Sequence, residues 1–258
     1  MLLKASRILI ALATVTSSAA FAADCVNGRN TATCTVPAGV TSMTLLLTGG
    51  GGGGGGAPSI GTGSTNYGGG GGGGGTCSIT LAVTPGSSIQ INAIGTSGIG
   101  GGSGLPQNGP TPPTEGTPGT AGGPTEVVYG SVTYQATGGV GGAAGTLSSP
   151  GSGGVGGTAV CPGGTATPGG TGGSGSAPVA GAGGDRGSSS APPLYGFGGL
   201  GQGVTSFATI GIPGVVWLTF TVPAAAAESI STLSEWAMIF MASLMAMFGY
   251  SRLRNRRA

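Results

Sequence analysis

A strand-like stretch runs directly into eight consecutive glycines, in the order Thr41-Ser42-Met43-Thr44-Leu45-Leu46-Leu47-Thr48 and then Gly49–Gly56. Side chains alternate between the two faces of a strand, so Met43, Leu45 and Leu47 share one face. A second run of eight glycines, Gly68–Gly75, leads into another alternating stretch at residues 77–84. This switch from alternation to pure glycine predicts strands that carry long glycine-rich excursions.

Four more stretches have the composition of strands. Residues 89–93 follow the Pro85-Gly86 turn, and residues 126–129 and 132–136 flank Gly130-Ser131, a hairpin turn dipeptide. Residues 215–222 form the strongest candidate, because they are rich in β-branched and aromatic side chains. The chain is therefore expected to be mostly β, with a small antiparallel sandwich or barrel-like framework at about 34–222 and large irregular glycine-rich segments.

Two explanations of the glycine tracts remain open. Gly/Ser-rich segments usually behave as flexible linkers. Alternatively, the tracts pack as polyglycine II helices, which have three residues per turn and must satisfy one another's backbone groups. Collagen is not expected, because the strict Gly-X-Y register is absent.

Charge is scarce in this chain. It has 62 glycines and 17 prolines in 258 residues, and charged residues make up 5%. The net charge of +2 comes from the two ends, because residues 23–229 hold two arginines and five carboxylates. Such a body has no basic surface for nucleic acid, and no nucleic-acid partner is expected.

The N-terminus has the layout of a secretory signal peptide, residues 1–22. Lys4 and Arg7 form the positive region, residues 8–20 are apolar with some Thr and Ser, and Ala20-Phe21-Ala22 is a small-residue cleavage site. We expect the mature chain to begin at Ala23, and the ectodomain to occupy residues 23–229.

The C-terminus, residues 230–258, has the layout of a membrane anchor. Residues 236–250 are uncharged and apolar, with Trp236 and Tyr250 at the two ends. Aromatic rings favour membrane interfaces, and four arginines follow as a stop-transfer flank: Arg252, Arg254, Arg256 and Arg257. The pattern predicts a single transmembrane helix over 236–250 with a cytoplasmic arginine-rich tail. The alternative is a buried core helix, which would normally show a polar face.

The motif before this helix reads Ile230-Ser231-Thr232-Leu233-Ser234-Glu235-Trp236, and it resembles the IPTL-CTERM sorting signal of Gram-negative bacteria. The family motif is Ile-Pro-Thr-Leu, two variable residues, then Trp-Gly. Ser231 stands in place of the proline and Ala237 in place of the glycine. The resemblance implies recognition by an exosortase in the inner membrane and removal of the tail, which leaves the ectodomain at the cell surface or outside the cell.

A second resemblance covers residues 34–222. A strand that runs into glycines, and the hairpin that runs into Ala136-Thr137-Gly138-Gly139, are similar to the glycine-rich domain of bacterial surface and phage-tail proteins. This resemblance implies a β-framework with glycine-rich loops and no enzymatic activity.

The four cysteines all follow the signal peptide, where an oxidising compartment favours disulfides. Cys25 and Cys34 flank the turn dipeptide Asn27-Gly28, which favours the pairs Cys25–Cys34 and Cys77–Cys161. A lipid-modified Cys25 is disfavoured, because Asp24 precedes it. A metal site or a catalytic thiol is the functional alternative.

Catalytic chemistry is not expected. The chain has no histidine, and its sole lysine, Lys4, lies in the signal peptide. Ser-His and Cys-His machinery and a phosphate-binding Gly-Lys-Ser/Thr loop are therefore excluded. The carboxylates Glu115, Glu126 and Asp185 are far apart in sequence. No cofactor and no metal are predicted.

The sequence thus favours an exported, non-enzymatic surface or matrix protein with a structural or adhesive role. Its aromatic side chains are candidates for contact with surface polysaccharide or as plugs of the framework core: Tyr67, Tyr195, Phe197 and Phe207. The alternative is a ligand- or ice-binding module on a polyglycine II bundle, which would need regular Thr/Ser rows at three-residue spacing.

Overall fold

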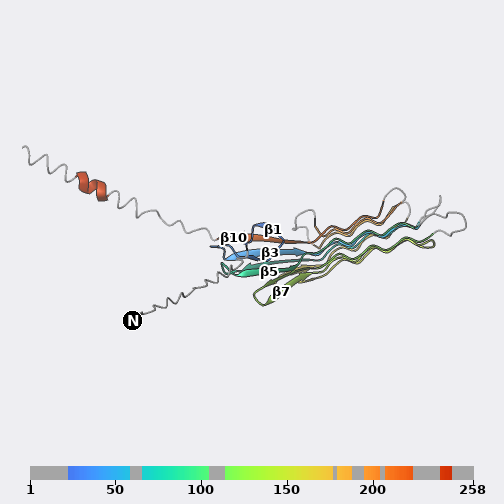
Figure 1. Ribbon diagram of the computed structural model, residues 1–258, viewed down its shortest axis with the longest axis horizontal. Helices are drawn as coiled ribbons and strands as arrows, with labels where there is room; N and C mark the ends of the chain where they lie inside the picture. The colour runs from blue at the N-terminus through green and yellow to red at the C-terminus, as the bar shows by residue number, and fades with distance from the viewer. Residues whose placement is uncertain are drawn as a thin grey trace, which may run out of the picture.

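The computed structural model describes residues 23–58, 66–104, 114–176, 179–187, 195–203, 207–222 and 239–245. Within them, two five-stranded antiparallel sheets pack face to face, and a bundle of glycine-rich segments continues from one end of this sandwich (Figure 1). The predicted framework is therefore a sandwich, and the glycine tracts form a second, ordered part of the molecule.

The first sheet has the order β1 (Gly28–Asn30), β10 (Val215–Thr221), β3 (Ser42–Thr48), β4 (Thr76–Ala82), β9 (Thr165–Thr167). The second has the order β2 (Cys34–Thr35), β5 (Ser88–Ala93), β6 (Thr125–Tyr129), β7 (Val132–Ala136), β8 (Ala159–Val160). All six predicted stretches contain strands. The four strands that were not predicted, β1, β2, β8 and β9, are two or three residues long and lie at the sheet edges.

The core lies between the sheets and follows the predicted alternation. Met43, Leu45 and Leu47 of β3 are fully buried, as is Leu218 of β10. Trp217 of β10 is only partly buried and is absent from the core cluster. It pairs with Leu46, whose side chain lies on the outer face of the sheet, because successive residues of a strand face opposite ways.

The two runs of eight glycines are the inner segments of the bundle. Three successive amides, those of Gly52, Gly53 and Gly54, donate to three different segments, at the carbonyl oxygens of Gly72 (2.9 Å), Thr120 (2.9 Å) and Thr209 (3.0 Å). Their own carbonyl oxygens accept from three further segments, through the amides of Gly199, Gly142 and Gly101 (2.8 Å each). The pattern repeats every third residue, which is the periodicity of polyglycine II helices.

The second inner segment, Gly68–Gly75, is surrounded in the same way. Gly71, Gly72 and Gly73 donate to Gly199, Val140 and Gly170 and accept from Gly184, Gly52 and Gly157. The backbone groups of these extended segments form no hydrogen bonds within their own segment, and the neighbouring segments supply their partners. The flexible-linker explanation is wrong for the described part of these tracts.

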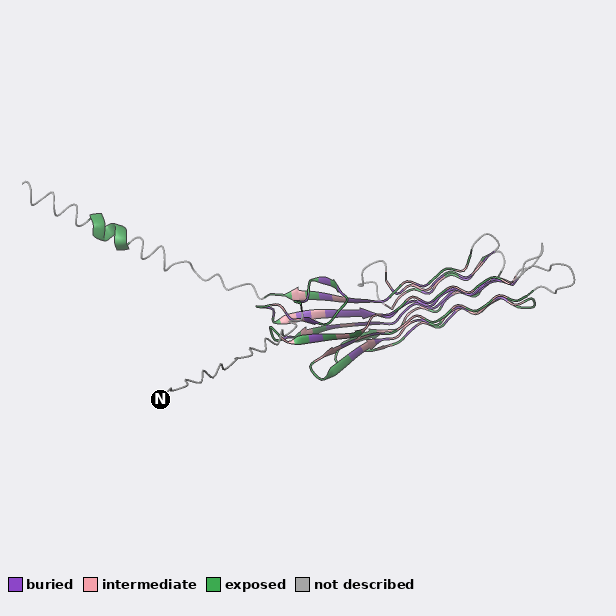
Figure 2. Cartoon of the chain, viewed as in Figure 1, coloured by how far each residue is buried: buried purple, intermediate pink, exposed green. Residues whose placement is uncertain are grey.

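The outer segments form a closed ring around the inner pair. Each is hydrogen-bonded to the next along the chain, and Gly211 closes the ring by donating to Gly98 at 2.8 Å. Both inner segments are buried along their length, in line with the strands they extend (Figure 2). The outer segments are residues 95–104, 116–123, 137–145, 151–158, 169–175, 181–187, 196–202 and 207–214.

Close packing explains the unbroken glycine runs. A Cβ added at any residue of Gly49–Gly56 or Gly68–Gly75 would lie 1.8–2.3 Å from a backbone oxygen of a neighbouring segment. Outer segments have neighbours on one side only, so they tolerate a side chain at the positions that face outward. This steric difference explains why the inner segments consist of glycine alone, whereas the outer segments have the pattern Gly-Gly-X.

The chain leaves the sandwich at the end opposite the bundle. Thr221, the last residue of β10, pairs with Ser42, whereas Val215 pairs with Thr48 next to the first glycine run. Ala23 lies at the same far end, because its carbonyl oxygen accepts from Thr35, which pairs with Ser88 at the start of β5. The bundle therefore projects away from both ends of the described ectodomain.

Only residues 239–245 of the expected membrane segment are described, and they form a short, exposed helix. Among the described residues, no helix combines the length and the apolar character needed to cross a membrane. The rest of the predicted span 236–250 lies outside the described residues.

Candidate functional site

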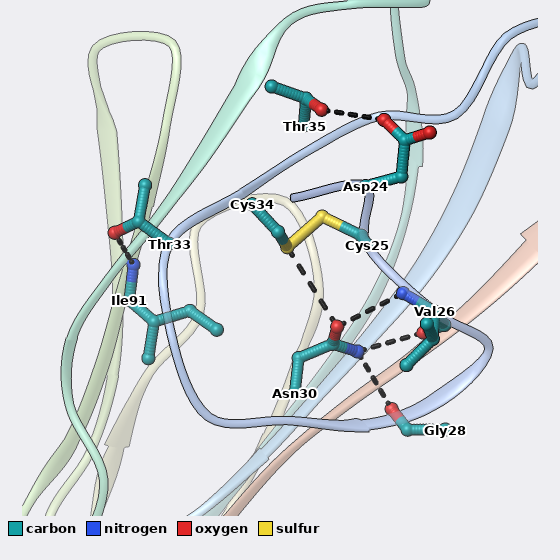
Figure 3. Close-up of a disulfide and its surroundings, with 9 residues drawn as sticks. All are labelled: Asp24, Cys25, Val26, Gly28, Asn30, Thr33, Cys34, Thr35 and Ile91. Atoms are coloured by element: carbon teal, nitrogen blue, oxygen red, sulfur yellow. Dashed lines mark hydrogen bonds between the residues drawn. A yellow bond between two sulfur atoms is a disulfide. The ribbon is translucent and has the colours of Figure 1, made fainter. Parts of the chain in front are cut away.

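Both predicted disulfides are present. Cys25, just before β1, is bonded to Cys34 of β2, and Cys77 of β4 is bonded to Cys161, which follows β8. The first bridge closes a loop held by Asn30, whose side-chain amide donates to the carbonyl oxygens of Val26 (2.8 Å) and Gly28 (3.1 Å) (Figure 3). The described part of the chain has no free cysteine, so these residues act as structural staples.

The exposed surface of the bundle is the part of the molecule best placed to meet a partner. Threonine hydroxyls accept hydrogen bonds from backbone amides at the edges of the bundle, in a repeated arrangement that we call the threonine seal. The Thr120 amide donates to Ile99 O at 2.9 Å, and the Ile99 amide donates back to the Thr120 hydroxyl at 2.7 Å. The same exchange joins Thr117 with Gly102, Thr137 with Thr158, and Thr209 with Leu200. Each hydroxyl stands in for a neighbouring segment that the edge of the bundle lacks.

Three exposed apolar side chains lie on one pair of neighbouring outer segments. Leu200 lies on the segment 196–202, and its carbonyl oxygen accepts from Thr209 on the segment 207–214. Close to Thr209 in the chain, Phe207 and Ile210 are 82% and 63% exposed, and Leu200 is 51% exposed. We call Leu200, Phe207 and Ile210 the apolar ridge.

The other candidate aromatics have structural surroundings. Tyr67 is buried at the start of the second inner segment. Arg29 of β1 lies over the ring of Tyr195 at 5.7 Å, and Arg186 lies over the ring of Phe197 at 5.1 Å. These cation–π contacts tie the outer segment that begins near Tyr195 to β1 on one side and to the segment 181–187 on the other.

The carboxylates of the described residues lie on separate parts of the fold. Burial lowers the pKa of Arg186, while neighbouring Asp185 opposes this shift. The Glu126 carboxylate accepts from the side-chain amides of Asn92 (2.8 Å) and Gln135 (3.3 Å) on the neighbouring strands β5 and β7. Glu115 directly precedes the outer segment 116–123, and Asp185 lies on the segment 181–187. Across the described ranges, no group of His, Cys, Asp or Glu could hold a metal ion.

The sorting residues lie outside the described residues. This holds for the whole motif Ile230–Trp236, for Arg252, Arg254, Arg256 and Arg257, and for the signal-peptide residues Ala20 and Ala22. Ala23, the predicted first residue of the mature chain, is exposed.

The sequence analysis did not predict the threonine seal. Thr117 and Thr120 are one polyglycine II turn apart, and that spacing is visible in the sequence. Their partners, Gly102 and Ile99, depend on the pairing of two segments that the glycine composition leaves unspecified.

Comparison with known families gives one match. The IPTL-CTERM motif matches residues 229–257. The match does not extend to residues 34–222, where the resemblance to the glycine-rich domain stays a prediction. No curated protein matches this chain. The segment 229–257 is thus similar to a C-terminal sorting signal that exosortase processes, which indicates an exported, exosortase-sorted surface protein.

Proposed function

We propose that this protein is a non-enzymatic surface protein with a structural or adhesive role. Its disulfide-stapled sandwich is held next to the membrane in the precursor, and its rigid glycine bundle projects outward. One observation carries the proposal. The described ectodomain begins and ends at the end of the sandwich opposite the bundle, because Thr221 pairs with Ser42 while Val215 pairs with Thr48. An anchor that follows β10 would therefore hold the sandwich next to the membrane and the bundle away from it.

The precursor has three further features in this proposal. A signal peptide is cleaved after Ala22, the helix at 236–250 spans the inner membrane, and the arginine-rich tail stays in the cytoplasm. Exosortase then cuts near the motif 230–236 and releases the ectodomain toward the cell surface. The sequence match at residues 229–257 supports this order of events.

Rigidity supports a structural role. Eight residues at ~3.1 Å each give the inner segments a length of about 25 Å, and their backbone groups are paired along that length. The apolar ridge offers a weakly charged surface for contact with polysaccharide or matrix polymers. Ice binding has less support, because the hydroxyls of Thr117 and Thr120 already accept backbone amides.

The test of sorting is intact mass spectrometry of the protein from native cells and from cells that lack the exosortase. Native cells should yield a chain that starts at Ala23 and ends near residue 230. Cells without exosortase should accumulate a longer chain in the inner membrane, and truncation after Ser229 should release a soluble ectodomain. A full-length chain in native cells, or a truncated chain that stays with membranes, would contradict the proposal.

The adhesive role is tested on the ridge. The variant Leu200→Ser/Phe207→Ser/Ile210→Ser should retain the melting temperature, because these side chains are exposed, and should lose binding to purified surface polysaccharide. Val155→Ser, an equally exposed apolar position on another outer segment, is the matched control. Equal binding by both variants would leave a structural role only.

A further inference from the structure

One pair of outer segments lacks the threonine seal. Gly170 and Gly173 donate their amides to the carbonyl oxygens of Asp185 (2.6 Å) and Ala182 (2.7 Å), as Thr120 does to Ile99. Because glycine stands where the sealed pairs have threonine, no hydroxyl is present to accept the amides of Asp185 and Ala182. Neither amide has an acceptor within the described part of the chain. We call Gly170, Gly173, Ala182 and Asp185 the open edge.

Other unsealed positions are covered by side chains. Val140 and Ala143 donate to Val155 and Ser152, and both carry a Cβ where the open edge has none. At Gly123, the hydroxyl of Thr96 fills the space, since an added Cβ would lie 2.6 Å from it. At Gly170 and Gly173, an added Cβ would first meet the amides of the paired residues, at 3.0 Å.

The spacing of the unpaired amides of Ala182 and Asp185 indicates which kind of backbone can bind there. Ala182 and Asp185 are three residues apart, which is one polyglycine II turn or ~9.3 Å, whereas a β-strand repeats every two residues, or about 6.7 Å. A continuous row of matching acceptors therefore comes from another polyglycine II segment. Glycine at 170 and 173 leaves room for a second backbone to approach closely.

We propose that the open edge binds the open edge of a second copy of this chain, so that two bundles join into one continuous hydrogen-bonded lattice. The chain next to Gly170 supplies acceptors, because the carbonyl oxygens of Pro168 and Thr171 accept no hydrogen bond within the described ranges. A surface with both donors and acceptors can pair with itself around a twofold axis. The proposed contact repeats the one that already joins neighbouring segments inside the bundle.

Charge does not oppose this contact. The edge carries one carboxylate, Asp185, and the next residue is Arg186, so two copies meet without net repulsion. Unpaired edges of extended backbone are templates for association, and natural proteins block them where association is unwanted. Threonine hydroxyls or other side chains cover the other edges of this bundle, and positions 170 and 173 carry glycine instead.

The test is the oligomeric state of the full chain in mild detergent, measured by light scattering over a ~100-fold concentration range. The parent should form a dimer as concentration rises. Gly170→Thr/Gly173→Thr should weaken the dimer by about tenfold or more, because it supplies the missing hydroxyls. Neither glycine has a positive φ, so threonine is compatible with the backbone. Gly170→Ala/Gly173→Ala, with a smaller side chain, should weaken it as well.

Amide hydrogen exchange locates the contact. Exchange at Ala182 and Asp185 should slow as the parent dimerises and should not depend on concentration in the threonine variant. All variants keep the C-terminal helix, so association through that helix would be equal in each. A monomeric parent, a dimer that both variants leave unchanged, or protection that appears only with added polysaccharide would overturn the proposal.

Discussion

Thr120 and Ile99 exchange two hydrogen bonds across the rim of the bundle, one between backbone groups at 2.9 Å and one from the Ile99 amide to the Thr120 hydroxyl at 2.7 Å. A side chain thereby does what a neighbouring segment does in the interior. At the rim of the bundle, threonine side chains thus satisfy backbone amides that a neighbouring segment would satisfy in the interior.

Thr120→Val should cost about 1 kcal/mol of unfolding free energy, because it removes the acceptor of the Ile99 amide and keeps the shape of the side chain. Chemical denaturation measures the cost, and faster hydrogen exchange at Ile99 localises it. Thr171→Val is the matched control, since the Thr171 hydroxyl makes no hydrogen bond with the described residues. Equal losses in the two variants would contradict the capping role.

Gly53→Ala should destabilise the bundle by about 3 kcal/mol or more, because overpacking against backbone cannot be relieved by a rotamer change. The added Cβ would lie 2.0 Å from the carbonyl oxygen of Ile99. Gly102→Ala on an outer segment is the control, since its Cβ would meet only the Thr117 hydroxyl, at 3.4 Å. Thermal melts should separate the two, and a Gly53→Ala protein that melts like Gly102→Ala would count against close packing of the inner segments.

Removal of the Cys77–Cys161 bridge should destabilise the protein more than removal of Cys25–Cys34. The two loops span 84 and 9 residues. Closure of a longer loop removes more entropy from the unfolded chain, about 4.6 against about 2.6 kcal/mol in the chain-entropy model. Paired Cys→Ala variants, compared by denaturant unfolding, check the order, and the reverse order would show that loop entropy does not control these bridges.

Leu218→Ala should cost more than Trp217→Ala, although tryptophan is the larger side chain. Leu218 is fully buried between the sheets, so its truncation leaves a cavity worth about 2–5 kcal/mol. Trp217 is partly exposed on the outer face and should cost less. Unfolding free energies of the two variants decide the matter, and an equal or larger loss at Trp217 would place it in the stabilising core.

Stability should fall as pH rises above about 10, where tyrosine in the unfolded chain begins to ionise. Burial raises the pKa of Tyr134, so the folded protein resists this ionisation while the unfolded chain does not. The stabilisation is complete below the unfolded-state pKa and is lost as pH rises through the folded-state pKa. Tyr134→Phe should reduce this loss in pH-dependent melts, and an unchanged alkaline profile would exclude Tyr134 as its source.

The sequence predicts the long strands and the cysteine pairing because both depend on local patterns, as in the alternation at 43–47 and the turn at Asn27-Gly28. The short edge strands β8 and β9 escape prediction, since two or three residues are too few for a pattern. Order in the glycine runs could not be decided either, because glycine loses much entropy on ordering and regains stability only from six neighbouring segments at once. The outward position of Trp217 depends on register, and one residue of slip exchanges the two faces of a strand.

The hydrogen-bond pattern of the bundle repeats every three residues, and this repeat restricts how the gene for this protein can change in length. Insertion of one glycine into Gly49–Gly56 would redirect every later amide toward the wrong neighbour, whereas three added glycines restore the phase one turn further on. An insertion that keeps the stability must also be matched in the antiparallel run Gly68–Gly75. Every third residue of Gly49–Gly56 is hydrogen-bonded to every third residue of that run. Natural length variants of this bundle should therefore differ by whole turns in several segments together, even though uninterrupted glycine codons would otherwise favour single-codon slippage.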